Sequence, residues 1–211
     1  MCKKFKKAYS KADSLIVPKV YTEFSTKETL DMIREAKKKT EKQLIFAEAT
    51  PHHIALTEED TIKYGTLAKM NPPLRSKEDR EALITGIQDG TIDMIATDHA
   101  PHSAEEKAKG LEGSAFGIVG LETAFPLLYT ELVLNSKIIT LSRLVDLMST
   151  NPRERFNIPL RPDDYAIWEL DESFVVDPEK FLSMGRATPF AGRTLYGVIK
   201  ETVYGGNKVY G

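Results

Sequence analysis

Apolar positions in the first half of the chain follow two different spacings. Continuous apolar runs rich in β-branched residues predict buried strands over residues 14–21, 43–49 and 91–97. Between these runs, apolar residues recur at helical spacing, and each helical stretch begins with a capping sequence, at residues 25–28 and 76–79. The order of strand, helix, strand, helix, strand is typical of right-handed βαβ units in a parallel sheet. The pattern therefore predicts an α/β fold.

The middle of the chain is expected to be helical. Apolar residues at helical spacing predict helices over residues 121–134 and 140–148. Asn151 followed by Pro152 predicts the start of another helix, with the asparagine as its cap and the proline at the first helical position. The consecutive prolines within residues 70–75 exclude helix, so this segment is expected to be an extended loop.

The pattern changes again near the C-terminus. Short stretches of alternating apolar and polar residues occupy residues 165–170, 174–176 and 195–210. Such stretches predict a small β-rich segment, because side chains on successive strand residues point to opposite faces. We therefore expect two parts, residues 1–160 with the parallel sheet and residues 161–211 with the β-rich appendage.

Composition and charge exclude several classes of protein. Of the 211 residues, 41% are hydrophobic and 28% charged, which is ordinary for a globular protein. The 29 lysines and arginines nearly balance 31 aspartates and glutamates, so no basic field attracts nucleic acid or an anionic membrane. Cys2 is the single cysteine, and no apolar run approaches membrane-spanning length. We expect a cytoplasmic protein that binds neither nucleic acid nor membranes.

The most prominent candidate for chemistry is Asp98, which directly follows the predicted strand over residues 91–97. His99 comes next, and His102 follows after an alanine and a proline. The carboxyl ends of parallel strands are where α/β enzymes place their reactive groups, and a carboxylate there can hold a divalent metal and accept a proton from its bound water. Asp98 can equally cap a turn while the histidines form local hydrogen bonds. The residues alone leave both interpretations open.

Two further segments are candidates for ligand binding. Asn71 and Arg75 lie in the two-proline loop, and a rigid loop with an amide and a guanidinium suits a ligand that carries a carboxylate or an imide. The glycines that follow Phe116, starting with Gly117, allow backbone N–H groups to approach a ligand closely. A turn that leads into a helix explains these glycines equally well.

The adjacent histidines His52 and His53 are a weaker candidate. In an extended segment, adjacent side chains point to opposite faces, so both histidines do not readily reach one ion, and we favour a structural role. The sequence contains no P-loop, no Gly-x-Gly-x-x-Gly after a strand and no nucleophile elbow. These motif-defined nucleotide and hydrolase sites are therefore not expected.

Five ordered motifs together resemble dihydroorotase, a family of the amidohydrolase superfamily. The motifs lie at residues 50–53, 69–75, 89–93, 96–102 and 116–122. Matches at residues 151–153 and 185–190 extend the resemblance, which covers residues 25–211. Allantoinase and dihydropyrimidinase share the general layout, but the pentad at residues 98–102 favours dihydroorotase.

The resemblance implies a fold, a reaction and a set of site residues. The fold is a (β/α)8 barrel, and the reaction is the zinc-dependent, reversible closure of N-carbamoyl-L-aspartate to dihydroorotate in pyrimidine biosynthesis. By resemblance, Asp98 binds the metal and moves the proton between water and the ring nitrogen. Asn71, His102 and the backbone at Phe116 and Gly117 would hold the substrate, with His102 helping to neutralise its carboxylate.

The chain also departs from the family pattern. The first metal motif of the family, His-x-His, is absent, and all four histidines lie between His52 and His102. Glu23 stands where the family has a further histidine; its carboxylate can in principle bind zinc. The three predicted strands would be the last three of the barrel, and three strands cannot close one. The open edge would then require a second copy, another protein or a missing N-terminal half.

Three hypotheses follow from the resemblance and the departures. In the first, the chain catalyses the dihydroorotase reaction only when a partner supplies the missing ligands. In the second, it is a non-catalytic binding or assembly subunit, for instance beside aspartate transcarbamoylase. In the third, it is a truncated fragment without an independent role. One retained ligand cannot hold a catalytic zinc, so we expect the isolated chain to be inactive or nearly so.

Overall fold

A short parallel sheet lies in the first half of the chain. The computed structural model describes residues 15–17, 26–39 and 45–211. Within them, β1 (Leu15–Val17), β2 (Ile45–Ala49) and β3 (Met94–Ile95) pair in parallel in the order β1-β2-β3, with Leu15 opposite Ile45 and Glu48 opposite Met94. The predicted parallel α/β arrangement is confirmed. β3 is shorter than predicted, although Asp93 and Ala96 on either side still donate backbone hydrogen bonds to β2.

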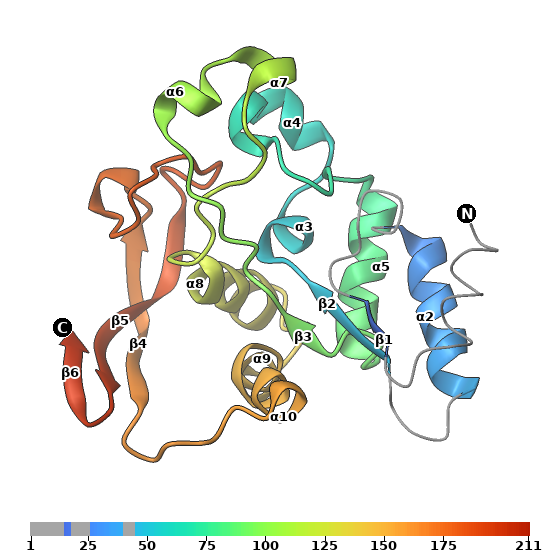
Figure 1. Ribbon diagram of the computed structural model, residues 1–211, viewed down its shortest axis with the longest axis vertical. Coiled ribbons are helices and arrows are strands. Elements are labelled where there is room, and N and C mark those ends of the chain that lie inside the picture. The colour runs from blue at the N-terminus through green and yellow to red at the C-terminus, as the bar shows by residue number, and fades with distance from the viewer. Residues whose placement is uncertain (1–14, 18–25, 40–44) are drawn as a thin grey trace.

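Two helices cover one side of these strands. α2 (Lys27–Lys39) and α5 (Lys77–Gln88) pack against each other and lie in the right half of Figure 1. The Ser76 hydroxyl accepts a hydrogen bond from the Asp79 N–H, which confirms the predicted cap of α5. A Cβ atom on Gly86 would lie 3.3 Å from the Leu30 side chain, so this glycine allows α5 to approach α2 closely. Ser25, in the other predicted cap, lies outside the described residues.

Several short helices carry the connections between the sheet and the second half of the chain. They are α3 (Pro51–Ala55), α4 (Glu59–Tyr64), the 3-10 turn η1 (Gly65–Ala68), α6 (Ala104–Lys107) and α7 (Gly110–Gly113). Figure 1 shows α4, α6 and α7 together at the top of the molecule. The predicted extended loop over residues 70–75 contains no helix, as its prolines require.

The first predicted helix of the middle region begins later than expected. α8 (Ala124–Leu128) continues as the π-helical turn η2 (Tyr129–Asn135), whereas the prediction began at residue 121. Backbone groups before Ala124 have other partners: the N–H groups of Gly120 and Leu121 donate to Nδ1 of His99. These long-range contacts hold the chain in turns, so the helix starts after them.

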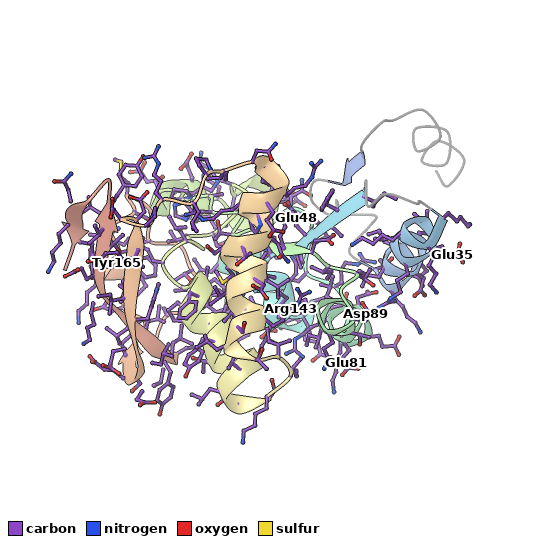
Figure 2. All side chains as sticks on the ribbon, turned by 90° about the horizontal axis from the view of Figure 1, so that it is seen from below. Glu35, Glu48, Glu81, Asp89, Arg143 and Tyr165 are labelled. Atoms are coloured by element: carbon purple, nitrogen blue, oxygen red, sulfur yellow. The ribbon has the colours of Figure 1, made fainter. Side chains whose placement is uncertain are left out.

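The next helical stretch is continuous where a new start was predicted. α9 (Leu141–Val145), the π-helical turn η3 (Asp146–Thr150) and α10 (Asn151–Phe156) follow one another without a break. The predicted role of Asn151 as a cap is therefore wrong, because its side-chain amide instead donates to the Asp93 carbonyl at 2.6 Å. Figure 2 shows this helix between the strand that bears Tyr165 and the helix α5, near which Glu81 and Asp89 are labelled.

The C-terminal residues form an antiparallel sheet, which confirms the predicted β-rich segment. Its strands are β4 (Tyr165–Val175), β5 (Thr194–Tyr204) and β6 (Asn207–Tyr210), in the order β4-β5-β6, with the 3-10 turn η4 (Pro178–Lys180) between the first two. The two short stretches predicted for residues 165–176 form one strand, because a register shift between Glu169 and Ser173 accommodates the polar residues between them.

The C-terminal sheet packs on α8 and η2. The ring centroid of Phe125 lies 4.4 Å from that of Trp168, and the Tyr196 N–H donates to the Thr130 hydroxyl at 2.8 Å. A Cβ atom on Gly197 would lie 3.3 Å from the Phe125 ring, so glycine permits this close packing. Within residues 15–17, 26–39 and 45–211, no helix is long and apolar enough to span a membrane. The division between residues 160 and 161 stays a prediction.

The largest apolar cluster joins the helices on both sides of the strands. Ile87 of α5, Leu128 of α8 and Leu144 of α9 are each fully buried in it. Arg143 supports the same junction, since its guanidinium donates to the carbonyls of Ile87 and Ile92 at 3.3 Å. The helices are thus held by a shared core rather than by the short sheet alone.

Replacing Leu128 by alanine tests this core. Leu128→Ala is expected to lower the free energy of unfolding by about 2–5 kcal/mol, because the buried side chain leaves a cavity. Urea denaturation followed by circular dichroism measures the change. Met184→Ala is the control, since Met184 is 99% exposed and its replacement is expected to change stability by less than about 0.5 kcal/mol. Equal stabilities of the two variants would contradict the proposed core.

Candidate functional site

Asp98 lies just beyond the carboxyl end of β3, as predicted. It is half-buried and its φ angle is +49°, in the left-handed region that few non-glycine residues adopt. Aspartate tolerates this region better than most side chains. The carboxylate is therefore held at the edge of the parallel sheet by an unusual local backbone rather than packed inside the core.

The neighbouring His99 is occupied by the backbone of another segment. Its Nδ1 atom accepts hydrogen bonds from the N–H groups of Gly120 and Leu121, both at 3.2 Å. Nδ1 is consequently unprotonated, and the proton of the neutral ring lies on Nε2, 3.5 Å from the Ser183 hydroxyl. For His99, the interpretation of local hydrogen bonding is supported, because the lone pair of Nδ1 is already used.

His102 is brought to the turn that contains Phe116. Its Nε2 atom lies 2.9 Å from the Phe116 carbonyl oxygen, so this nitrogen carries a proton and donates. On the other side of the ring, Nδ1 lies 3.5 Å from the Glu106 carboxylate. Hydrogen bonds from Ser103 hold the pKa of Glu106 below its usual value, and the nearby His102 contributes to this effect. Both ring nitrogens of His102 therefore lie near oxygen atoms of the chain itself.

Gly117 occupies a position that only glycine fits. Its φ angle is +118°, and a Cβ atom there would lie 2.4 Å from the Ala100 Cβ. The Gly117 N–H donates to the Lys69 carbonyl at 3.0 Å. The expectation of a free N–H group at Gly117 is therefore wrong, because this donor already links two loops of the protein itself.

Asn71 is exposed in its loop. The buried His53 forms a hydrogen bond with the backbone of Pro72, the residue that follows Asn71. The Nε2 atom of His53 bonds to the Pro72 carbonyl at 3.0 Å, and Nδ1 bonds to the Thr50 hydroxyl at 2.6 Å. His52 and His53 belong to α3, so the assumption of an extended segment is wrong. The structural role predicted for His53 agrees with these contacts.

Burial lowers the pKa of His53 below its usual 6.5. The carbonyls of Pro72 and Pro73 oppose this shift, and so does the negative charge of Asp98. Backbone hydrogen bonds connect the loops themselves: the Gly117 N–H donates to the Lys69 carbonyl, two residues before Asn71, and the Ala100 N–H, two residues after Asp98, donates to the Ile118 carbonyl. The segments that carry Asp98, Asn71, His102 and Phe116 are thus connected to one another through hydrogen bonds of the Phe116 turn.

Comparisons with known proteins show what the chain is similar to. No protein-family model matches the chain. A dihydroorotase from Geobacillus sp. (strain WCH70) is 50% identical over 192 residues, which are 88% of this chain and 44% of the relative. This chain is similar to dihydroorotases. It spans less than half the length of that curated relative.

Solved structures share the fold of the dihydroorotase-like chain. L-hydantoinase from Arthrobacter aurescens superposes with a TM-score of 0.78 at 29% identity, over 88% of this chain and 43% of that one. The inactive dihydroorotase-like domain of a Chaetomium thermophilum CAD-like multifunctional protein has a TM-score of 0.67 at 24% identity, over 88% and 49% of the two chains. The second likeness bears on the fold alone.

The described residues of the dihydroorotase-like chain do not by themselves form a zinc site. Within residues 26–39 and 45–211, no group of three or more histidine, cysteine, aspartate or glutamate side chains is placed to hold a metal. A zinc site takes three or four protein ligands, and Nδ1 of His99 is already engaged. Glu23, the other candidate ligand, lies outside the described residues. Asp98 is thus a single candidate ligand in this part of the chain.

Sequence reasoning missed the segment over residues 182–185, which lies against His99 and His102. The Glu122 carboxylate accepts hydrogen bonds from the N–H groups of Leu182 and Ser183 at 2.8 and 3.0 Å. A Cβ atom on Gly185 would lie 2.8 Å from the backbone N and O of His102. Gly185, the first residue of the motif at residues 185–190, is the sequence signal for this close contact.

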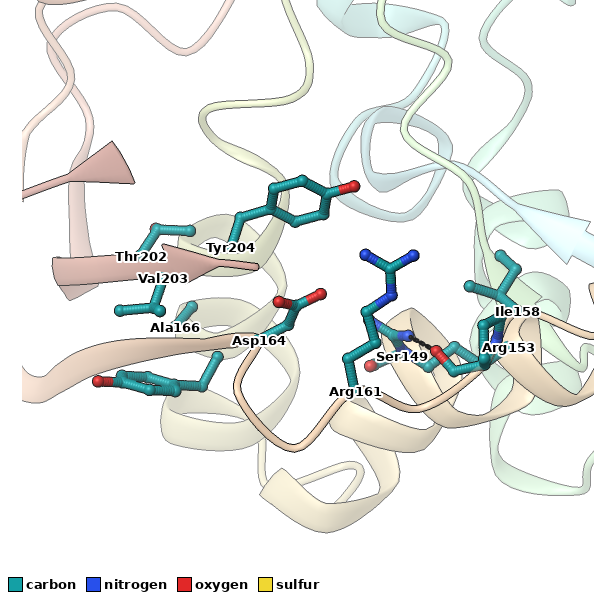
Figure 3. Close-up of a pocket in the computed structure, with 11 residues that line it drawn as sticks. Ser149, Arg153, Ile158, Arg161, Asp164, Ala166, Thr202, Val203 and Tyr204 are labelled. Atoms are coloured by element: carbon teal, nitrogen blue, oxygen red, sulfur yellow. Dashed lines mark hydrogen bonds between the residues drawn. The ribbon is translucent and has the colours of Figure 1, made fainter. Parts of the chain in front are cut away.

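A cavity of about 480 Å³ lies away from these residues, between α10 and the C-terminal sheet (Figure 3). Arg161 lies near Tyr204, with the guanidinium carbon 5.8 Å from the centre of the ring. Arg153 donates to the Pro159 carbonyl and Asp164 accepts from the Gly205 N–H, so these side chains mainly support the chain itself. None of the predicted site residues lines this cavity.

Replacing Gly117 by alanine tests the closeness of the Phe116 turn to Ala100. Gly117→Ala should lower the free energy of unfolding more than Gly110→Ala, by about 1–3 kcal/mol of overpacking. Gly110 is the matched control because its φ angle is also positive, at +71°, but no atom lies within 4 Å of its added Cβ. Urea denaturation compares the two variants, and equal losses would show that Ala100 does not restrict Gly117.

Acidification tests the burial of His53. Because its folded-state pKa lies below 6.5, the unfolded chain takes up a proton first as the pH falls. The wild-type chain should therefore lose unfolding free energy between pH 7 and pH 5 more steeply than the variant His53→Gln. Urea denaturation at several pH values measures both slopes. Parallel slopes would contradict a buried, neutral His53.

Proposed function

We propose that the dihydroorotase-like chain supplies the substrate-binding loops and a proton-transferring carboxylate for the interconversion of N-carbamoyl-L-aspartate and L-dihydroorotate. The observation that supports this most is the placement of Asp98 at the end of β3, beside a turn in which His102 lies 2.9 Å from the Phe116 carbonyl. The 50% identity to a protein named dihydroorotase agrees with it.

In this proposal each side chain has a chemical role that its surroundings suit. Ring closure joins the ureido nitrogen to a carboxylate carbon and breaks one of its C–O bonds. The departing oxygen leaves as water, with one proton from the nitrogen and a second from the solvent. The half-exposed carboxylate of Asp98 can carry the proton from the nitrogen. His102 helps to neutralise the remaining carboxylate of the substrate, and the exposed Asn71 amide pairs with the imide.

We further propose that the three parallel strands belong to a barrel that other residues complete. Three strands cannot close a barrel, and within the described strands β1 and β3 each pair only with β2. A second polypeptide, another copy or further residues of a longer chain would then supply the missing strands. The zinc ligands of the family would have to come from the same source, because the described residues do not assemble them.

A non-catalytic assembly subunit is the second candidate function. It is favoured by the hydrogen bonds of His53, His99 and His102, each of which is made to a backbone group of the chain itself. In that case the loops would keep their shape without metal chemistry, and the chain would act through its contacts with a partner.

Mixing experiments separate the two functions. The chain is combined with the part of the Geobacillus dihydroorotase that it does not span, and dihydroorotate hydrolysis and bound zinc are measured. The first function predicts turnover only in the mixture, with a loss of about 100-fold or more in kcat for Asp98→Asn. Asp163→Asn is the control, since Asp163 is exposed and distant in sequence from the site. A stable mixture without turnover would favour the assembly subunit, and unchanged activity of Asp98→Asn would refute the catalytic role.

A further inference from the structure

Lys107, the last residue of α6, is a buried cation that the proposed reaction does not use. Its side chain is almost fully buried, with 3% of its surface exposed. The ammonium lies 2.9 Å from the carbonyl oxygens of Ala115 and Gly117 and 3.3 Å from that of Lys69. A lysine ammonium has three N–H donors, so it can serve all three carbonyls at once.

These carbonyls belong to the two loops that carry the proposed substrate groups. Lys69 precedes Asn71 by two residues, while Ala115 and Gly117 flank Phe116. The Lys69 carbonyl also accepts a hydrogen bond from the Gly117 N–H. The Lys107 ammonium and this N–H therefore donate to the same oxygen. One side chain therefore connects the Asn71 loop to the Phe116 turn.

The position of α6 relates Lys107 to His102 as well. Ser103 and Glu106 form a reciprocal capping box at the start of α6, with the Ser103 N–H donating to the Glu106 carboxylate at 2.9 Å. The same carboxylate lies 3.5 Å from Nδ1 of His102. Because α6 has only four residues, its orientation depends on these contacts and on the buried Lys107.

A second lysine, Lys69, also contacts the segment that leads to Phe116. The Lys69 ammonium donates to the carbonyls of Ser114 and Glu112 at 2.6 and 3.0 Å and lies 4.3 Å from the centre of the Phe116 ring. Burial lowers the pKa of Lys107 to about 8, and the charge of Lys69 contributes to this shift. The turn thus retains two neighbouring cations despite their repulsion.

Core packing alone does not account for Lys107. A methionine would fill a similar volume without the free-energy cost of burying a charge, but it would leave three carbonyls without this donor. The hydrogen bonds of the ammonium in the described part of the chain all go to backbone carbonyls of the two loops. What the lysine provides is therefore a fixed arrangement of these loops.

We propose that Lys107 is a positioning residue that holds the Asn71 loop and the Phe116 turn at the separation required by a ligand with both a carboxylate and an imide. The inference rests on the proposed function for the identity of the ligand. Lys107 itself does not touch the ligand; it acts through Asn71, His102 and the backbone at Phe116.

Hydrogen exchange measured by mass spectrometry tests the loop arrangement without any activity. Lys107→Met should raise amide exchange about tenfold or more in peptides covering residues 69–75 and 112–120, because charge-assisted hydrogen bonds are lost there. Exchange in β5 should stay unchanged. Lys109→Met is the matched control, since Lys109 is exposed and makes no capping hydrogen bond. Lys107→Arg keeps the charge and donors and should restore part of the protection.

Kinetics in the complemented mixture give the second readout. Lys107→Met should raise KM for dihydroorotate about tenfold or more while kcat changes less, since the lost contacts orient the bound ligand. The inference is overturned if both loops exchange as in Lys109→Met, or if exchange rises equally throughout the chain in Lys107→Met and Lys107→Arg. Absence of turnover in the wild-type mixture would instead refute the proposed function, while localised exchange would still support the loop-holding role of Lys107.

Discussion

The candidate site depends on the close contact between the segment after β3 and the segment before α8. The Ala100 N–H donates to the Ile118 carbonyl at 2.9 Å, and His99 pairs with Ile118 as an isolated parallel bridge. A Cβ atom on Gly120 would lie 2.9 Å from the Thr97 carbonyl oxygen, so a side chain there would separate the segments. Without this contact, Asp98 and the Phe116 turn would not share one region.

In the structure, most of the side chains that could be catalytic form hydrogen bonds with backbone groups of the chain itself. His99 accepts hydrogen bonds from two backbone N–H groups, His102 donates one to a carbonyl, and the Lys107 ammonium donates to three carbonyls. Loops beyond the ends of short strands leave many backbone groups unpaired, and burial requires partners for them. The residues around Asp98 therefore build the shape of the loops, and contact with a ligand is the role proposed for Asp98 and Asn71.

The fold around this site is an assembly of small units that share one core. The parallel sheet is short, yet α5, α8 and α9 join through a buried cluster that includes Ile87 and Leu128. The C-terminal sheet adds the packing of Trp168 on Phe125. The chain spans 44% of the Geobacillus relative, and its described part still carries the loops proposed to bind substrate. Support of the loops and completion of a metal site are thus separate requirements.

The sequence by itself determined the order of parallel strands and helices, the cap of α5 at Ser76, the C-terminal β-rich segment and the place of Asp98 after a strand. These features depend on residues close to one another in the chain, whose periodicity and capping are visible in the sequence. Only the tertiary structure decided that α8 starts after the Gly120 contacts, that Asn151 bonds to Asp93 and that Lys107 joins two loops. Each of these contacts links residues distant in sequence or fills a buried space, and local patterns carry no information about such partners.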